Sequence, residues 1–203
     1  IISFLKPGII KVFYKSEEER ELFKILNKDQ SKDKKVAMFV GGCVRKYITN
    51  SEIDDIDIAT IFTPTELKKK FNNSKFKFLE TGVDHGSVTL ILNNVKFELT
   101  TLRKDDKTDG RYAEVSFIDN WTQDSERRDF TINAIYLDEK GKIFDPQLGK
   151  VDLENKVIKF IGDPEKRIQE DFLRIIRFIR FSLQYNYQKF EKSTLNAIKI
   201  NLA

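Results

Sequence analysis

An apolar run that ends on two glycines constrains the fold of this chain more than any other feature. Residues 36–40 are all apolar, which predicts a short buried strand, and Gly41-Gly42 stops it. Residues 43–48 then predict a helix, and residues 55–60 predict the next strand. A strand, a glycine turn, a helix and a second strand in close succession indicate a mixed α/β domain.

The remaining pattern adds helices and strands around this unit. Residues 17–28 have apolar positions at helical spacing, and Thr63-Pro64-Thr65-Glu66 announces a helix that runs to Phe71. Two strands follow at 87–92 and 95–102, joined by a tight hairpin at Asn93-Asn94. The polar stretch 104–112 predicts a mobile loop, and from Pro164 onward the periodicity is helical.

Length and composition set the domain organisation. With 203 residues and 40% hydrophobic content, the chain can form an α/β domain over 1–160 and a helical region over 161–203. No apolar run approaches the ~20 residues of a membrane span, so we expect a cytoplasmic protein that contacts no membrane. The sequence does not indicate an oligomeric state.

The charged and metal-binding residue types narrow the chemistry. A single cysteine, Cys43, excludes an internal disulfide, and a single histidine, His85, excludes the common zinc cages, so carboxylates must hold any metal. The net charge of +4 is compatible with a polyanionic partner. Basic residues gather in the helical region, whereas residues 52–57 form an acidic cluster.

The acidic cluster contains a pair of carboxylates on one strand. Side chains alternate along a strand, so Asp55 and Asp57 point to one side while Ile56 and Ile58 point to the core. Two carboxylates on one face repel each other unless a cation lies between them. Mg²⁺ prefers oxygen ligands and bridges carboxylates to substrate phosphates, which makes it the expected cofactor.

The glycine turn supplies a place for those phosphates. Gly41 and Gly42 have no Cβ to block a triphosphate, and the helix that follows favours negative charge at its start. Arg45 on that helix can bind a phosphate through two hydrogen bonds. Glu98, on the polar face of the strand 95–102, can add a third carboxylate if that strand lies beside the Asp55–Asp57 strand.

Seven motifs in order now carry a family resemblance: GGCVR, DDIDIAT, DHGSVTL, FELTTLR, ERRDFTINAI, FDP and EDFLRIIRFIRF. On these motifs the chain resembles the bacterial class II CCA-adding enzyme and poly(A) polymerase family of the nucleotidyltransferase superfamily, and the resemblance runs from about Ala37 to Tyr185. The resemblance implies a palm-like mixed sheet with flanking helices, followed by the start of an all-helical neck. It also implies transfer of nucleotides from CTP and ATP to the 3′ end of tRNA or another RNA.

The resemblance assigns roles to particular residues. It implies that Asp55 and Asp57 bind magnesium and that the RRDF motif binds the triphosphate and sugar. It implies that the EDxxR motif reads the incoming base. The nucleotide-binding residues implied in these two motifs and on the helix that follows are Arg127, Arg128, Asp129, Asn133, Asp171, Arg174, Arg177 and Arg180.

Base reading by such a motif has a physical basis. Asp171 and the arginines at 174, 177 and 180 recur every three residues, which predicts a polar stripe on one helix, with Phe172, Ile175, Ile176 and Ile179 packed inward. Cytosine and adenine both present an amino donor where guanine and uracil present an oxygen. A carboxylate beside a guanidinium therefore accepts C and A and rejects G and U.

The sequence departs from the family pattern at two positions and in its extent. Lys46 stands where the family has aspartate, and Lys150 stands where a second glycine is expected. The helical body that grips tRNA in the family has no counterpart before Ala203, so we expect a truncated form or a compact relative that works with another chain. Besides CCA addition, two alternatives stay open: addition of A alone or of part of CCA, and an RNA-binding module without catalysis.

Overall fold

The computed structural model of this protein describes residues 15–31, 34–109, 112–185, 187 and 189–202. Its strands are β1 (Ala37–Val40), β2 (Ile56–Thr60), β3 (Lys77–Leu79), β4 (Ser87–Leu92), β5 (Val95–Thr101), β6 (Arg103–Asp109), β7 (Tyr112–Phe117), β8 (Tyr136–Leu137) and β9 (Ile143–Phe144). Its α-helices are α1 (Glu17–Leu26), α2 (Gly42–Ile48), α3 (Pro64–Phe71), α4 (Trp121–Glu126), α5 (Gly149–Glu154), α6 (Pro164–Glu170), α7 (Leu173–Gln184) and α8 (Lys192–Leu202). Two 3₁₀ turns, η2 (Val83–His85) and η3 (Thr131–Asn133), complete the described elements.

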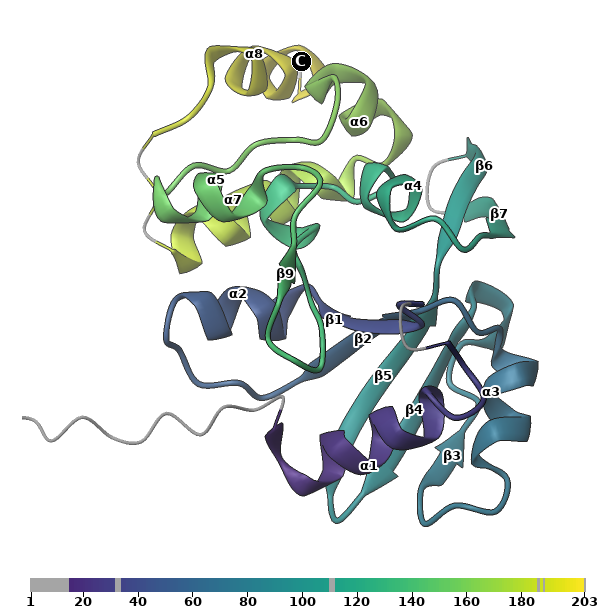
Figure 1. Ribbon diagram of the computed structural model, residues 1–203. Coiled ribbons are helices and arrows are strands. Elements are labelled where there is room, and N and C mark those ends of the chain that lie inside the picture. Colours follow the sequence, from purple (N-terminus) through teal and green to yellow (C-terminus); the bar gives the residue numbers. More distant parts are fainter. Residues whose placement is uncertain (1–14, 32–33, 110–111, 186, 188, 203) are drawn as a thin grey trace, which may run out of the picture.

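A seven-stranded mixed sheet forms the centre of the molecule, in the order β3-β4-β5-β2-β1-β8-β9. Only β2 and β5 pair in parallel in this sheet, and the other neighbours are antiparallel. Helices α6, α7 and α8 gather at one end of the molecule, and α1 and α3 lie beside the sheet at the other (Figure 1). The α/β fold with a mixed sheet and flanking helices, predicted from the sequence, is confirmed.

The core holds the strands against α1 and α3. Every residue of β1 is buried, as its apolar run predicts. Leu22 and Leu26 of α1 and Leu67 of α3 are fully buried in the same cluster as the sheet residues Ile58 and Phe97. Each such side chain stabilises the fold by roughly 1.5–3 kcal/mol relative to an exposed position. The strands that carry the candidate site therefore rest on a continuous apolar core.

Local signals in the sequence located two elements correctly. Helix α3 begins at Pro64 and ends at Phe71, and Thr63 and Glu66 form a reciprocal capping box at its start. The β4–β5 hairpin turns at Asn93 and Asn94, which have φ angles of 49° and 66°. Asparagine tolerates this left-handed conformation better than most residues, which explains the tight turn.

The prediction of a mobile loop over residues 104–112 is wrong. The structure has an antiparallel hairpin there, in which β6 pairs with β7 from Arg103–Phe117 to Asp109–Tyr112. The polar side chains of residues 104–109 do not predict a strand, but backbone hydrogen bonds to β7 hold them in one. In β7 itself, Tyr112, Val115 and Phe117 are residue types that favour a strand. This hairpin forms a sheet of its own. Residues 110 and 111 lie outside the described part of the chain.

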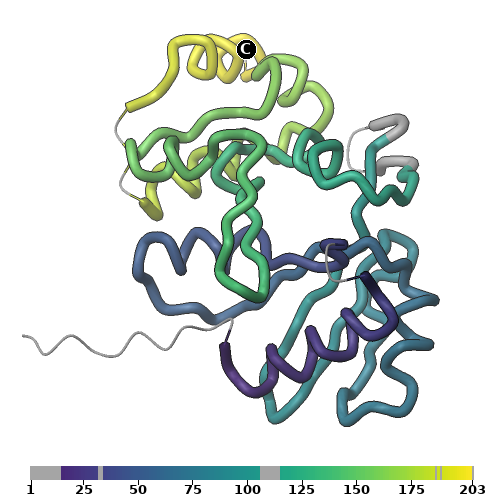
Figure 2. Tube along the Cα trace, viewed as in Figure 1, coloured from purple at the N-terminus to yellow at the C-terminus, as the bar shows by residue number. Residues whose placement is uncertain are grey.

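The helical region begins at Pro164, as predicted, but the inward face of α7 differs from the expectation. Ile175, Phe178 and Phe181 are buried, whereas Phe172, Ile176 and Ile179, predicted to pack inward, are 57%, 63% and 48% exposed. The rings of Phe178 and Phe181 pack on Phe160 and Phe130, so tertiary partners and not the apolar pattern decide which side of α7 faces the core. Figure 2 shows that α1 and α8 lie at opposite ends of the molecule.

The prediction that Asp171 lies on the same helix as Arg174 is also wrong. Asp171 forms the C-cap of α6 with φ −158°, and α7 begins only at Leu173. Its Oδ1 accepts a hydrogen bond from the backbone N–H of Leu173 at 2.9 Å. The carboxylate therefore sits at the junction of two helices. The division of the chain into units at residue 160 stays a prediction.

A glycine brings α5 against η3. A Cβ on Gly149 would lie 2.0 Å from the backbone oxygen of Thr131, so only glycine permits this contact. The adjacent Lys150 is exposed, and its backbone N–H donates to Asp145 at 2.8 Å. The second glycine that the family pattern suggests is therefore not needed at this turn. Among the described residues, no helix is long and apolar enough to cross a membrane.

Candidate active site

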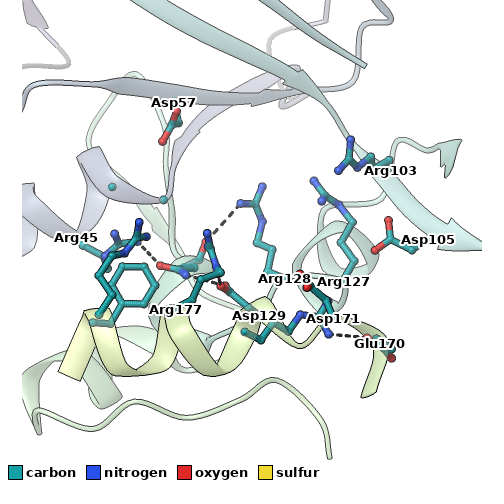
Figure 3. Close-up of a pocket in the computed structure, with 16 residues that line it drawn as sticks. Arg45, Asp57, Arg103, Asp105, Arg127, Arg128, Asp129, Glu170, Asp171 and Arg177 are labelled. Carbon is teal, nitrogen blue, oxygen red and sulfur yellow. Dashed lines mark hydrogen bonds and ion pairs between the residues drawn. The ribbon is translucent and has the colours of Figure 1, made fainter. Parts of the chain in front are cut away.

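A polar cleft of about 530 Å³ lies between the sheet and α7. One wall carries the glycine turn and the acidic strand, and the other carries the arginines of the helical region (Figure 3). Twelve of the fourteen predicted site residues line it, and Asp55 and Glu98 do not. The lining residues are Gly41, Gly42, Arg45, Asp57, Arg103, Asp105, Arg127, Arg128, Asp129, Asn133, Glu170, Asp171, Arg174, Arg177, Arg180 and Phe181.

The glycine turn lies directly against the acidic strand. Gly41 has φ +74°, and a Cβ there would lie 3.3 Å from Oδ2 of Asp57. A Cβ on Gly42 would lie 4.0 Å from the same oxygen. The turn therefore needs glycine at position 41 for its backbone conformation and for room beside the carboxylate. Backbone amides at the start of α2 and the Asp57 carboxylate thus share one wall of the cleft.

Asp57 on β2 and Glu98 on β5 lie near Asp55, which directly precedes β2. Asp57 is directly opposite Glu98 in the parallel pairing of β2 with β5, as expected if the two strands are neighbours. Burial, together with the negative charges of Glu98 and Asp55, raises the pKa of Asp57 above its ordinary value. No hydrogen bond or ion pair holds the Asp57 carboxylate within the described residues. A charged group with this repulsion and no partner is a good receptor for a cation.

The same carboxylates fit a magnesium ion by their chemistry. Across the part of the chain that the structure describes, no three His, Cys, Asp or Glu side chains form a ready-made metal group. Glu98 forms an ion pair with Lys96. Asp55 and Asp57 remain as two oxygen donors whose mutual repulsion a divalent cation relieves, and Mg²⁺ commonly takes its other ligands from substrate phosphates and water.

A buried carboxylate organises two of the predicted arginines. Asp124 is fully buried and accepts hydrogen bonds from Arg127 Nε at 2.9 Å and from Arg128 Nη2 at 2.9 Å. It also accepts from the Tyr136 hydroxyl at 2.8 Å and from the backbone N–H of Arg103 at 3.2 Å. Burial alone raises its pKa, but the guanidinium groups of Arg128 and Arg127 lower it to about 2. Asp124 therefore stays ionised and holds both arginines at the cleft.

A second network joins the sheet side of the cleft to α7. Asp129 accepts hydrogen bonds from Arg177 Nε at 2.6 Å and from the Asn133 side chain at 2.7 Å. Asn133 accepts in turn from Arg45, whose Nε donates to the Tyr185 hydroxyl at 3.1 Å. Arg45 also lies 4.9 Å above the Phe181 ring. Two of its donors are thus occupied, so Arg45 is positioned for a phosphate but is not free to bind one through its whole guanidinium.

The predicted base-reading pair lies at the far end of the cleft. Arg174 does not pair with Asp171, because its Nη1 donates to Glu170 at 2.6 Å and to the Arg167 carbonyl at 2.7 Å. Asp171 and Arg174 nevertheless line the same cleft. Arg180 lies over the Phe181 ring at 4.8 Å and pairs with no carboxylate of the described residues. The helical wall of the cleft therefore carries two carboxylates, those of Glu170 and Asp171, and three guanidinium groups, those of Arg174, Arg177 and Arg180.

Sequence reasoning missed several residues that shape this site. Arg103 and Asp105, from the start of β6, line the cleft, and Glu170 and Asp124 hold its arginines. Asp124 stands three residues before Arg127 on α4, a spacing that allows an ion pair on one helix turn. This spacing is the sequence signal from which the role of Asp124 could have been predicted. Asp105 gave none, because residues 104–112 predicted a loop, whereas Arg103 is the last residue of the FELTTLR motif.

The two unusual residues near the glycine turn lie away from the cleft. Lys46, which stands where the family pattern has aspartate, forms an ion pair with Asp54 and does not line the cleft. Cys43 is fully buried, and its Sγ–H donates to the Val40 carbonyl at 3.2 Å. It therefore packs in the core beneath the turn.

Comparison with known proteins completes the description of the site. The family model described as the Poly A polymerase head domain matches residues 37–159, which include the glycine turn and the acidic strand. The chain belongs to this family. The family resemblance stated from the motifs is thus confirmed.

Curated relatives in the family carry names of tRNA enzymes. The chain is 40% identical over 185 residues to "CCA tRNA nucleotidyltransferase 1, mitochondrial" of Mus musculus, a match that covers 89% of this chain and 43% of the relative. It is 40% identical over 181 residues to the "CCA-adding enzyme" of Staphylococcus epidermidis, with 88% and 44% covered. The chain therefore spans less than half the length of these relatives.

Solved structures match the fold. The CCA-adding enzyme of Bacillus stearothermophilus in complex with CTP matches with a TM-score of 0.77 and 33% identity, over 92% of this chain and 44% of that one. A tRNA nucleotidyltransferase complexed with a primer tRNA and an incoming ATP analog matches with a TM-score of 0.65 and 28% identity, over 82% and 47%. Both matches extend beyond the region that the family model covers.

Proposed function

We propose that this chain is the catalytic half of a template-independent RNA nucleotidyltransferase that adds CCA to the 3′ end of tRNA from CTP and ATP. The cleft that places Gly41, Gly42 and Asp57 opposite the arginines of α7 supports the proposal most. The relatives named CCA-adding enzymes and the matched structure with CTP point to the same activity. Residues 1–160 form its catalytic head and residues 161–203 its neck; a cytoplasmic location stays a prediction.

The incoming nucleotide lies along the cleft in this proposal. Its triphosphate approaches the backbone of Gly41 and Gly42 and is balanced by Arg128 and Arg45. Asp55 and Asp57 hold Mg²⁺, with Glu98 beside them. When bound, the metal lowers the pKa of the attacking 3′-hydroxyl and stabilises the departing pyrophosphate.

The sugar and base then extend toward the helical wall. Asp129 and Asn133, already bonded to each other, meet the ribose, while Arg177 and Arg127 add positive charge near it. Asp171 accepts from the amino group of cytosine or adenine, and Arg174, held in direction by Glu170, donates to the neighbouring ring nitrogen. Guanine and uracil leave these groups unpaired, and because Arg174 is buried this disfavours them.

Separate assays of CTP and ATP test this proposal. The purified 203-residue chain is incubated with Mg²⁺ and radiolabelled CTP or ATP, on tRNA ending at the discriminator base and on tRNA ending in CC. We expect C on the first substrate and A on the second, and less than about 1% of either with Asp57→Asn, because a metal-binding carboxylate is lost.

The matched control is Asp84→Asn, which removes an exposed carboxylate on η2 outside the cleft. It should retain the activity of the parent chain. Incorporation of A alone, on any RNA, would show that the chain adds only A and would contradict CCA addition. RNA binding without incorporation in the parent chain, at any Mg²⁺ concentration, would defeat the enzymatic proposal.

A further inference from the structure

A second cavity adjoins the candidate nucleotide cleft on the other side of Asp57. It has a volume of about 450 Å³ and shares Gly41, Asp57, Arg103, Arg127 and Arg128 with the cleft. Its remaining walls come from the ends of strands in the sheet and from η2, with no residue of α6 or α7. Asp57 therefore stands between two spaces, of which only one reaches the helical wall.

The floor of this second cavity carries two hydroxyl groups. Ser87 and Thr100 are opposite each other on β4 and β5, and their side-chain oxygens are 3.0 Å apart. Thr100 is two residues beyond Glu98 on β5, so alternation puts it on the same face of the sheet as the carboxylates. Two hydroxyls hold two donors, and their mutual bond uses one. The pair can therefore donate one hydrogen bond to a ligand and accept others.

The rim of the cavity carries an arginine, Arg103, that forms no ion pair within the described residues. Arg103 lines both spaces. Its guanidinium donates to the His85 carbonyl, and its buried Nε has no hydrogen-bond partner. Arg103 and Arg127 lie on the opposite side of the cleft from Arg45 (Figure 3). Arg127 and Arg128, by contrast, both pair with the carboxylate of Asp124.

An in-line displacement at phosphorus needs two substrates on opposite sides of the reacting group. We propose that the second cavity holds the terminal nucleotide of the RNA acceptor, with the Ser87–Thr100 pair on its ribose and Arg103 on its phosphodiester. This assignment rests on the proposed function, because it takes the cleft beside α7 as the site of the incoming nucleotide. Two neutral hydroxyls suit the 2′-hydroxyl that distinguishes RNA from DNA.

The test combines three variants with two acceptors. Ser87→Ala, Thr100→Val and Arg103→Gln are compared with the parent chain on an RNA ending in ordinary ribose and on the same RNA with a 2′-deoxy terminal residue. We expect the KM for RNA to rise about fivefold in the hydroxyl variants and about tenfold in Arg103→Gln, with an unchanged KM for CTP in the hydroxyl variants. The parent should prefer the ribose terminus about fivefold, and Ser87→Ala should lose that preference.

Thr81→Val is the control, because it removes a hydroxyl of a second bonded pair, Thr81–Thr89, which lines neither space. It should change neither KM. Equilibrium binding of both fluorescent RNAs, measured beside thermal melts, separates recognition from turnover and from misfolding.

The outcomes separate the inference from the proposed function. A raised KM for CTP with an unchanged KM for RNA would overturn the inference and leave nucleotidyl transfer standing. A preference for the ribose terminus that survives in Ser87→Ala and Thr100→Val would also overturn it. If the parent chain incorporates no nucleotide but binds the ribose-ended RNA more tightly, and Ser87→Ala abolishes the difference, the proposed function falls while the contact of Ser87 with the terminal ribose stands.

Discussion

Asp124→Asn should destabilise the protein more than any other single carboxylate change near the site. The substitution removes the charge that faces Arg127 and Arg128, whose side chains are only 15% and 16% exposed. It also places an amide nitrogen among groups that donate to the carboxylate, including the Tyr136 hydroxyl. Two guanidinium groups then stay in a half-buried position without a counter-charge.

The magnitude follows from the pKa of Asp124. A carboxyl whose pKa lies at about 2 instead of 3.8 contributes roughly 2 to 3 kcal/mol of folding free energy when both states are ionised. Breaking a buried ion pair by removing one partner costs about 3–5 kcal/mol. We therefore expect a loss of about 3 kcal/mol at pH 7, equivalent to about 6–12 °C in Tm for a domain of this size.

Urea denaturation between pH 2 and pH 7 measures this loss. Because the folded-state pKa is lowered, the contribution of Asp124 is full above the unfolded pKa and disappears as the pH falls toward about 2. The deficit of the variant should shrink accordingly. Tyr136→Phe, which removes one hydrogen bond and no charge, should lose about 1 kcal/mol. Asp119→Asn, an exposed carboxylate beyond β7, should change stability by less than about 0.5 kcal/mol.

Two results would refute this reasoning. An Asp124→Asn variant as stable as Asp119→Asn at pH 7 would show that the arginines find other partners at no cost. A deficit that is the same at pH 2 and at pH 7 would show that packing, and not charge, accounts for the effect.

Two further predictions concern the glycine contact and the acidic strand. Gly149→Ala should destabilise the fold by about 3 kcal/mol, since its Cβ would lie 2.0 Å from the Thr131 carbonyl oxygen; a melt that matches the parent would contradict this contact. Asp57→Asn should stabilise the metal-free protein at pH 7, because burial, Glu98 and Asp55 raise the pKa of Asp57 and the ionised form is disfavoured. The gain should appear as the pH rises through the raised pKa, and Mg²⁺ should stabilise the parent more than the variant. If Mg²⁺ stabilised the parent and the variant equally, the Asp57 carboxylate would not be a ligand of the ion.

The sequence predicted those features that depend on neighbouring residues. The capping signal at Thr63 and Pro64 located α3, and alternation along the strand predicted that Glu98 lies on its polar face. Both depend on periods of two or of 3.6 residues and on short-range turn chemistry, so one sequence suffices. The glycine turn at 41–42 belongs to the same class.

The remaining features depend on contacts between distant residues. Arg45 is held by Asn133 and Tyr185, which no local pattern connects to it. The buried side of α7 was predicted wrongly because that helix is amphipathic with isoleucines on two sides, and only Phe130 and Phe160 decide between them. The hairpin of β6 and β7 was missed because backbone pairing, and not side-chain hydrophobicity, defines it.

The depth of Cys43 makes this chain convenient for labelling. Burial raises the pKa of its thiol to about 12, and the reactive thiolate is therefore scarce at neutral pH. It is also the single cysteine of the sequence. A cysteine introduced at an exposed position such as Leu183 on α7, which is 76% exposed, would react with a maleimide fluorophore while the native one stays silent. Spectroscopic rulers can thus be attached to the neck without first removing a native residue.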